Sequence, residues 1–253
     1  MKSFTPYSSV NKILDYLLIN TSDILNDQLI GMYIHGSLAL NDFVPDRSDI
    51  DLVIVTKNTL TDNLLEKLKF LHERITLSDL PYSKRIECIY IPIKSLKNYS
   101  QEKAYFPCLH VGGKFYIDGF GLIEKYILRE NGITIKGQNP KLFIKPVTPS
   151  ELKRVAFESL KNWWLPQLTN HSRLVKDDYQ VYAILTMCRA FYTIENGDIV
   201  SKSKAASFVK KTLDKKWTLL IDEALLWKIG KNFNHLKETL DFIQFTLNKL
   251  GCE

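Results

Sequence analysis

Residues 36–51 carry the side chains of this chain whose types and spacing point most clearly to chemistry. The segment begins with Gly36 and Ser37 and ends with an Asp-x-Asp pair, Asp49 and Asp51. Because residues two apart in a strand share a face, the two carboxylates can bind one hard cation such as Mg²⁺. Gly36 lets the backbone approach a phosphate closely, and Ser37 offers it an N–H and a hydroxyl. The pattern therefore indicates a site for a metal ion and a triphosphate.

The sequence around the two short motifs supports their interpretation as a functional site. A single Asp-x-Asp is usually the solvated end of a strand, and a single Gly-Ser is usually a turn. Here the apolar run 32–34 precedes the glycine, and the apolar run 52–55 follows the second aspartate. This combination is much rarer by chance than either motif alone. It is not a Walker phosphate loop, because no Gly-Lys-Ser/Thr follows Gly36.

Glu87 is the candidate third carboxylate. It lies in 85–92, where the alternation of residues predicts a strand that Pro92 ends. Metal-assisted transfer of a phosphate-linked group to a hydroxyl needs a group that takes the proton of that hydroxyl, or a third ligand for the metals. A carboxylate among apolar strand residues must lie at an exposed edge or in a charged site that offsets its desolvation. Beside the Asp-x-Asp motif, we interpret Glu87 as part of the site.

The elements that must position these side chains follow from the apolar periodicity of the first half. The predicted helices are 8–28, with a break near 20–22, then 61–76 and 120–130; the predicted strands are 30–35, 51–57, 85–92 and 133–135. Residues 98–119 have little periodicity and predict a surface loop or a short hairpin. This half is expected to be a mixed sheet with flanking helices.

The second half has helical periodicity throughout. Thr148, Pro149 and Glu151 have the spacing of an N-cap, a first helical residue and a capping-box partner. Predicted helices are 149–168, 177–195, 201–212, 215–229 and 232–250. We therefore expect an α+β protein with two domains, a mixed-sheet domain with flanking helices over 1–145 and an all-helical domain over 146–253.

Composition restricts the classes of protein to consider. The chain has 253 residues, of which 45% are hydrophobic and 25% charged, as in ordinary globular proteins. No apolar run is long enough to span a bilayer, so no membrane association is expected. The four cysteines lack metal-binding spacing and are interpreted as reduced thiols of a cytoplasmic protein. The net charge of +6 is dispersed rather than gathered into a basic stripe, so no stable nucleic-acid complex is expected.

Two blocks of sequence resemble known families. The Gly-Ser and Asp-x-Asp motifs with their flanking strands resemble the nucleotidyltransferase superfamily, whose fold is that of polymerase beta. Residues 185–206 resemble the C-terminal domain of the streptomycin/spectinomycin adenylyltransferases, which confer aminoglycoside resistance in bacteria. The shared features are Leu-Thr-x-x-Arg at 185–189, a Gly-x-Ile turn at 197–199 and Lys-x-x-Ala-Ala at 202–206. The likeness extends to 86–89 and 129–133, and so covers nearly the whole chain.

The resemblance implies an enzyme that moves AMP from ATP to a hydroxyl of an aminoglycoside or aminocyclitol. Asp49, Asp51 and Glu87 would hold Mg²⁺, two ions being expected, and Glu87 would be the general base. The residues implied in ATP binding are Gly36, Ser37, Ser48, Arg189 and Lys202.

The resemblance also implies contacts to the drug. Glu87 would touch the reacting hydroxyl, and Asp178 and Tyr182 stand where the family has an acidic and a polar contact. Relatives that modify streptomycin have a tryptophan in the loop that corresponds to 105–115, and this chain has none there. A spectinomycin-like substrate is therefore favoured over streptomycin. His110, in the same loop, is interpreted as an ordinary loop histidine, with contact to the substrate as the alternative.

The expected partners are ATP and a small cationic antibiotic, and the chain is taken as a monomer. Two other functions stay open. One is a nucleotidyltransferase of the toxin or antitoxin type that modifies protein or tRNA. The other is a non-catalytic nucleotide-binding module, which intact Asp49, Asp51 and Glu87 argue against.

Overall fold

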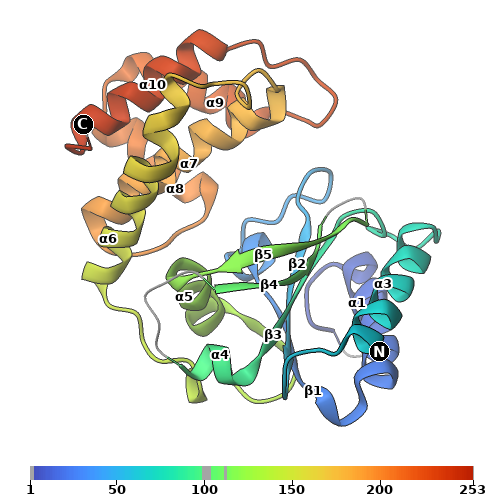
Figure 1. Cartoon of the computed structure of the whole chain (residues 1–253). Helices are drawn as coiled ribbons and strands as arrows, with labels where there is room; N and C mark the ends of the chain where they lie inside the picture. Colours follow the sequence, from blue (N-terminus) through green and yellow to red (C-terminus); the bar gives the residue numbers. More distant parts are fainter. Residues whose placement is uncertain (1–2, 99–103, 111–112, 253) are drawn as a thin grey trace. The chain divides into compact units, whose positions relative to one another are not determined.

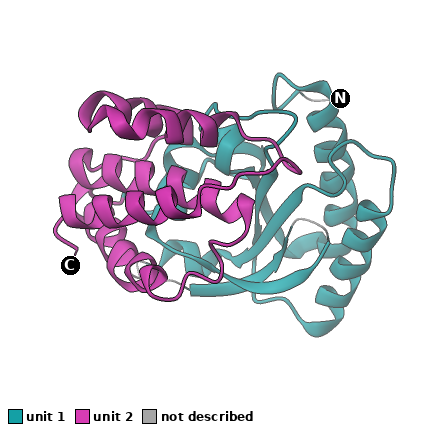
Figure 2. Ribbon diagram, turned by 90° about the horizontal axis from the view of Figure 1, so that it is seen from above, with its two compact units in different colours: residues 1–146 teal, residues 147–253 magenta. Residues whose placement is uncertain are grey.

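The computed structural model describes residues 3–98, 104–110 and 113–252, and the chain forms two compact units. Unit 1 comprises Met1–Pro146 and unit 2 comprises Val147–Glu253 (Figure 2). The two units have different architectures: unit 1 is built on a sheet, whereas the described part of unit 2 is helical throughout.

Unit 1 contains a six-stranded mixed sheet (Figure 1). Its strands are β1 (Leu29–Ile34), β2 (Ile50–Thr56), β3 (Ile86–Pro92), β4 (Ala104–Leu109), β5 (Phe115–Phe120) and β6 (Ile133–Lys136), in the spatial order β5-β4-β3-β2-β1-β6. β2 and β3 run parallel, and all other neighbouring strands are antiparallel. The parallel pair is possible because α3 (Asp62–Thr76) provides the crossover between its two strands.

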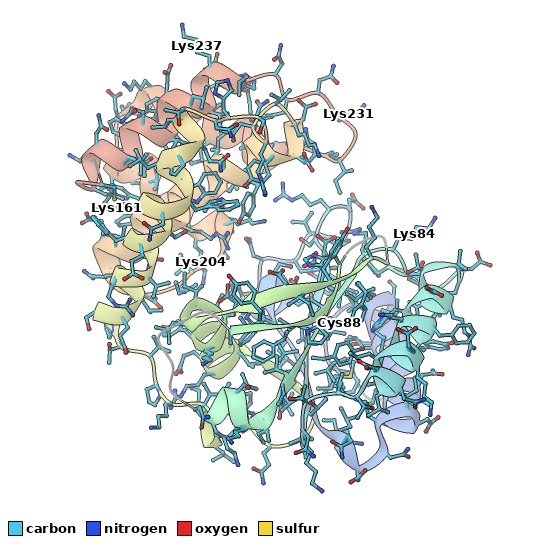
Figure 3. The ribbon with its side chains drawn as sticks, viewed as in Figure 1. Lys84, Cys88, Lys161, Lys204, Lys231 and Lys237 are labelled. Atoms are coloured by element: carbon cyan, nitrogen blue, oxygen red, sulfur yellow. The ribbon has the colours of Figure 1, made fainter. Side chains whose placement is uncertain are left out.

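Helices cover both faces of the sheet because alternate strand residues are apolar on each side. On one face, α1 (Ser8–Leu25) and α3 pack on strand residues such as Ile34, Leu52 and Cys88. On the other face, α4 (Ile93–Lys97) and α5 (Leu122–Asn131) pack on Val53, Val55 and their neighbours. Figure 3 shows Cys88 in the interior of unit 1. The remaining short elements of unit 1 are α2 (Gly36–Ala39) and the 3₁₀ turns η1 (Asn26–Gln28) and η2 (Pro140–Leu142).

Two local expectations for unit 1 need correction. The predicted break near 20–22 is absent, because Thr21 is buried in the core face of a continuous α1 and packing there outweighs its weak helix propensity. Within 98–119, residues 99–103 and 111–112 lie outside the described residues. The described remainder forms the antiparallel strands β4 and β5, so the hairpin interpretation is right and the loop interpretation is wrong.

Unit 2 is formed by five α-helices and shorter helical turns in its described residues. They are α6 (Pro149–Ser159), the π-turn η3 (Leu160–Trp164), η4 (Leu165–Leu168), α7 (Asp177–Asn196), α8 (Lys202–Thr212), η5 (Lys215–Trp217), α9 (Thr218–Leu226) and α10 (Leu236–Lys249). Their apolar faces enclose one core around Trp164, Phe191 and Phe242. The predicted capping box is confirmed: Thr148 N donates to Glu151 Oε2 over 2.8 Å, and Glu151 N donates to Thr148 Oγ1 over 3.3 Å.

Some helices of unit 2 are shorter than the periodicity predicts. The predicted helix 149–168 is α-helical only to Ser159 and continues as a π-turn and then a 3₁₀ turn. Pro166 has no N–H for the α-helical ladder, which accounts for the change of helix type there. The predicted helix 215–229 begins as a 3₁₀ turn, and its α-helix ends at Leu226.

Candidate functional site

The turn at Gly36 is fitted against Asp51. β1 ends at Ile34, and Gly36 then adopts a φ of +59°, a left-handed conformation that side chains with a Cβ rarely tolerate. A Cβ added to Gly36 would lie 1.8 Å from Asp51 Oδ2. The N–H of His35 also donates to the carbonyl of Asp51 over 2.9 Å. The glycine is therefore required both by its backbone angle and by the carboxylate that occupies the space beside it.

Asp51 and Glu87 are neighbours across the parallel pair of strands. In the register of β2 and β3, Asp51 lies opposite Glu87, so both side chains leave the sheet on the same face. Asp49 precedes Asp51 by two residues, just before β2 begins. The structure thus places Asp51 and Glu87 side by side and Asp49 at the same end of these strands, although oxygen atoms of all three carboxylates do not lie within 4.8 Å of one another. Three oxygen donors of this kind fit a hard divalent cation.

Arg85 holds the segment that leads into these carboxylates, a role that no predicted motif indicated. Its Nη1 donates to the carbonyl of Pro45 over 2.6 Å, and its Nη2 donates to the carbonyl of Ser48. Its Nε lies 3.7 Å from Asp49 Oδ1, and its guanidinium lies 5.2 Å from the centre of the Tyr82 ring. The signal that could have revealed it is Arg-x-Glu at 85–87, which places a guanidinium on the same face as the predicted base.

His110 and Asp118 lie near Glu87 on the side of β3 that is away from Asp51. His110 Nδ1 lies 3.6 Å from Glu87 Oε1, and His110 Nε2 lies 3.3 Å from Asp118 Oδ2. β3 and β4 are antiparallel with Cys88 opposite Leu109, a register that sets Glu87 beside His110. His110 follows β4 in the loop, as expected, and its contacts with Glu87 and Asp118 give this loop histidine two acidic neighbours. Neither residue belongs to a local motif, and only the pairing of three strands reveals the cluster.

Two serines of the predicted ATP site have different surroundings. The hydroxyl of Ser37 is shielded from solvent and has no hydrogen-bond partner among the described residues. A polar atom in that state retains an unmet capacity to bond, as expected at a ligand site. Ser48 instead uses its hydroxyl within the chain, since it accepts a hydrogen bond from Val44 N over 2.9 Å. Its predicted contact with ATP stays a prediction.

His35, which directly precedes the turn at Gly36, anchors that turn to a neighbouring helix. It is partly buried, and its Nε2 donates to the carbonyl of Glu124 over 3.1 Å, which ties the turn to α5. Loss of hydration lowers the pKa of His35, and the nearby Glu124 carboxylate opposes that effect only in part. The ring is therefore expected to be neutral at physiological pH, and its role in the turn is structural.

The remaining predicted site residues belong to unit 2. Arg189 lies on α7, and its Nε is shielded without a hydrogen-bond partner among the described residues. Lys202 is the exposed first residue of α8, where a positive charge opposes the helix dipole and is not favoured by helix stability alone. Both positions are compatible with binding to an anion. The contact of either residue with ATP stays a prediction.

Asp178 and Tyr182 lie one turn apart near the start of α7. The Asp178 carboxylate accepts a hydrogen bond from Tyr179 N over 2.9 Å, and both Asp178 and Tyr182 are exposed. The Tyr182 ring packs against those of Trp164 and Tyr179, with ring centres 5.8 and 5.5 Å away. An exposed carboxylate beside aromatic rings is suited to a cationic ligand. Their role in drug binding also stays a prediction.

Two stretches of the chain match known protein families. Residues 19–106, which include β1, β2 and β3, match the nucleotidyltransferase domain. Residues 144–249 match the C-terminal domain of aminoglycoside adenylyltransferases. The chain belongs to the aminoglycoside adenylyltransferase family. The family resemblance and the predicted enzyme class, an adenylyltransferase, are confirmed.

Curated relatives of this family align over most of the chain. A spectinomycin 9-adenylyltransferase of Campylobacter jejuni is 27% identical over 244 residues, which cover 88% of each protein. The enzyme of the same name from Enterococcus faecalis is 24% identical and covers 96% of this chain and 97% of its own length. That of Staphylococcus aureus is 23% identical and covers 80% and 78%.

A solved structure confirms the fold class. A crystal structure of the spectinomycin adenyltransferase of Enterococcus faecalis, with ATP and spectinomycin, superposes with a TM-score of 0.71. The match covers 97% of this chain and 99% of that one at 21% identity, so it establishes a shared fold.

Among the helices that the structure describes, none combines the length and the apolar character needed to cross a bilayer.

Proposed function

We propose that this protein transfers AMP from ATP to a hydroxyl of spectinomycin in an Mg²⁺-dependent reaction. The observation that carries the proposal is the pairing of Asp51 with Glu87 across β2 and β3, beside the turn at Gly36. The family to which the chain belongs supports adenylyl transfer, and three relatives named spectinomycin 9-adenylyltransferase support the acceptor. The sequence of 105–115 is consistent with this choice, because it lacks the tryptophan that the family resemblance associates with streptomycin as the substrate.

In the proposed reaction, Glu87 accepts the proton of the acceptor hydroxyl. The hydroxyl oxygen then forms a bond to the α-phosphorus of ATP as the bond from that phosphorus to the bridging β-phosphate oxygen breaks. The products are the adenylylated drug and pyrophosphate. A base positioned in this way contributes a rate factor of about 10² to 10⁴.

Asp49, Asp51 and Glu87 would hold Mg²⁺, and their carboxylate oxygens are the ligands that this ion prefers. When bound, the ion would neutralise charge that builds up on the phosphate oxygens. Arg85 keeps Asp49 in place through its bonds to the chain before it. Gly36 and Ser37 would contact the terminal phosphates, where the unpartnered Ser37 hydroxyl can donate.

Unit 2 would supply the remaining contacts. Arg189 and Lys202 would bind the ATP phosphates, with a guanidinium fork and a mobile ammonium suited to the task. Asp178 and Tyr182 would bind the cationic drug. We further propose domain limits of 1–145 and 146–253, a monomeric state and a cytoplasmic location for this enzyme.

The test is acceptor-dependent release of pyrophosphate by the purified chain with ATP and Mg²⁺. Spectinomycin should stimulate release strongly and yield a product whose mass has increased by one adenylyl group, whereas streptomycin, tRNA and a protein mixture should not. Stimulation by tRNA or protein alone would favour an enzyme of the toxin or antitoxin type. ATP binding without turnover on any acceptor would favour a non-catalytic module.

A further inference from the structure

A second group of potential metal ligands lies on the β4–β5 hairpin. Cys108, His110 and Asp118 each offer one ligand atom, and these atoms all lie within 4.8 Å of one another. Among the described residues, no other three histidine, cysteine or acidic side chains meet this condition. The carboxylates that would bind Mg²⁺ are a different set, so the hairpin group is not explained by adenylyl transfer.

The strand register accounts for the grouping. Cys108 and His110 are two residues apart along β4 and its end, so they leave the chain on the same side. On β5, Asp118 lies opposite Phe106, which is two residues before Cys108 and therefore shares that side. The ring of Tyr116 packs edge-on against His110, with ring centres 5.2 Å apart, and restricts its position.

The ligand types and their spacing select a class of metal. Thiolate, imidazole and carboxylate are the three donors that bind Zn²⁺ in proteins, whereas Mg²⁺ prefers oxygen alone. Zn²⁺ bonds of about 2.0 to 2.3 Å in a tetrahedron place neighbouring ligand atoms about 3.3 to 3.8 Å apart. His110 Nε2 and Asp118 Oδ2 already lie 3.3 Å apart. The other two separations, which involve the Cys108 sulfur, need to shorten by about 1.3 Å or less to bind the ion.

The outer contact of His110 fits the same interpretation. Histidine ligands usually donate their second ring N–H to a carboxylate, which fixes the tautomer and strengthens the ligand. Here Nε2 faces Asp118 while Nδ1 faces Glu87 Oε1 at 3.6 Å. The carboxylate in this position is the one that we assign as general base.

We propose that Cys108, His110 and Asp118 form a binding site for a Zn²⁺-class divalent cation, with Glu87 orienting His110 from outside. Three protein ligands leave a fourth position to water. The bound ion would join the end of β4 to β5 and so stabilise the β4–β5 hairpin next to Glu87. Burial raises the pKa of Cys108 to about 12, with smaller contributions from Glu87, Asp118 and Asp51, so ion binding releases the thiol proton to solvent.

The test uses Co²⁺ as a spectroscopic probe of the full-length, metal-free chain in excess Mg²⁺. We expect one equivalent of Co²⁺ to produce a thiolate-to-cobalt charge-transfer band, and Zn²⁺ to remove it. Oxygen ligands cannot give this band, so Co²⁺ bound at Asp49 and Asp51 does not interfere. Cys108→Ser should abolish the band, and the matched control Cys188→Ser, which alters a buried cysteine of unit 2, should retain it.

Two further variants keep the test independent of folding. The Asp118 side chain is 46% exposed, so Asp118→Asn should fold normally. It should weaken Zn²⁺ binding at least 10-fold, because loss of even an outer contact to a metal ligand typically lowers metal affinity by that factor. Glu87→Gln should keep the band and weaken binding about 10- to 100-fold. Zn²⁺ should raise the Tm of the unaltered chain and not that of Asp118→Asn.

Absence of the band, or its persistence in Cys108→Ser, would overturn the site. Unchanged Zn²⁺ affinity in Asp118→Asn would do the same. These outcomes are distinguishable from failure of the proposed function, because the readouts need neither ATP nor drug. A chain that binds Co²⁺ through its thiolate and transfers no AMP would refute only the enzyme assignment.

Discussion

Gly36 and Asp51 occupy adjoining space, with the site of a Cβ on Gly36 only 1.8 Å from Asp51 Oδ2. The contact joins the end of β1 to the start of β2, two antiparallel strands that the sheet holds side by side. A phosphate-binding turn and a metal-binding carboxylate are thereby kept at a fixed separation by the backbone. The first prediction follows from this contact.

Gly36→Ala should reduce both stability and turnover. The left-handed backbone angle alone costs about 1 to 2 kcal/mol for a residue with a Cβ. The clash must also displace the Asp51 carboxylate, so kcat should fall more than stability explains. Gly230→Ala is the matched control, since Gly230 has a φ of +83° with no atom within 4 Å of the added Cβ. Urea unfolding and steady-state turnover measure the two effects.

The contribution of the clash can be isolated in a double mutant. If Asp51 is the obstacle, the stability cost of Gly36→Ala should fall toward that of Gly230→Ala when Asp51 is also replaced by alanine. A cost that is the same with and without the Asp51 side chain would show that the backbone angle alone requires glycine.

Glu87→Gln should lower kcat by about 10² to 10⁴-fold while ATP still binds. The amide keeps the size of the side chain but cannot accept the proton from the drug. Glu66→Gln is a suitable control, because Glu66 lies on the surface of α3 with its side chain 71% exposed. Turnover and equilibrium ATP binding are measured on both variants. Near-normal turnover in Glu87→Gln would remove the assignment of the base.

Arg85→Lys should weaken the response of the enzyme to Mg²⁺. Lysine retains the charge but has all its N–H donors on one nitrogen, so it cannot reproduce the bonds that Nη1 and Nη2 donate to Pro45 and Ser48, and the segment before Asp49 is held less firmly. The Mg²⁺ concentration for half-maximal turnover should rise about 10- to 100-fold, as for other outer contacts of metal ligands. Arg74→Lys on α3 is the control, since Arg74 is exposed and its guanidinium lies 6.0 Å from the centre of the Phe70 ring on the same helix. An unchanged Mg²⁺ response would limit Arg85 to a structural role.

The parts of the site that the sequence predicts are those set by neighbours along the chain. Gly36 with Ser37, and Asp49 with Asp51, form local patterns whose strand and turn contexts follow from apolar runs and alternation. Glu87 was found by its unusual place in an apolar strand. Its meeting with Asp51 depends on the parallel pairing of β2 and β3, which no local pattern specifies.

The parts that the sequence did not predict depend on tertiary pairing. His110 and Asp118 lie in a stretch with weak periodicity, and only the register of β3, β4 and β5 brings them to Glu87. The continuous α1 was also not predicted, because burial of Thr21 in the core outweighs the low helix propensity that suggested a break near 20–22. By contrast, the capping box at Thr148 needs only residues three apart, and it was predicted correctly.

Arg189→Gln should raise the KM for ATP about 10- to 100-fold, the loss expected for a charged hydrogen bond of about 1.5 to 3 kcal/mol. The unpartnered Nε and the match to the family motif support this expectation. The KM for the drug should change little. Arg154→Gln is the control, because Arg154 pairs with Glu158 on the surface of α6. Equal effects on both KM values would indicate a general loss of structure instead.

His72 makes the stability of unit 1 sensitive to acid. The side chain is fully buried on α3 with its Nε2 2.5 Å from the Tyr90 hydroxyl, and burial lowers its pKa from 6.5 to about 4. The unfolded chain therefore binds this proton at a higher pH than the folded chain does. The free energy of unfolding should decrease as the pH falls from about 6.5 to about 4, by up to about 3 kcal/mol from this residue.

His72→Gln should remove this part of the pH dependence, because glutamine does not titrate. Urea unfolding between pH 7 and pH 4 should show a shallower decrease for the variant, even if its stability at pH 7 is lower. His171→Gln in unit 2 controls for the loss of one histidine and should retain the slope. Loss of hydration also lowers the pKa of His35, so some acid sensitivity will remain in His72→Gln. Identical slopes for the unaltered chain and His72→Gln would mean that His72 does not protonate on unfolding in this range.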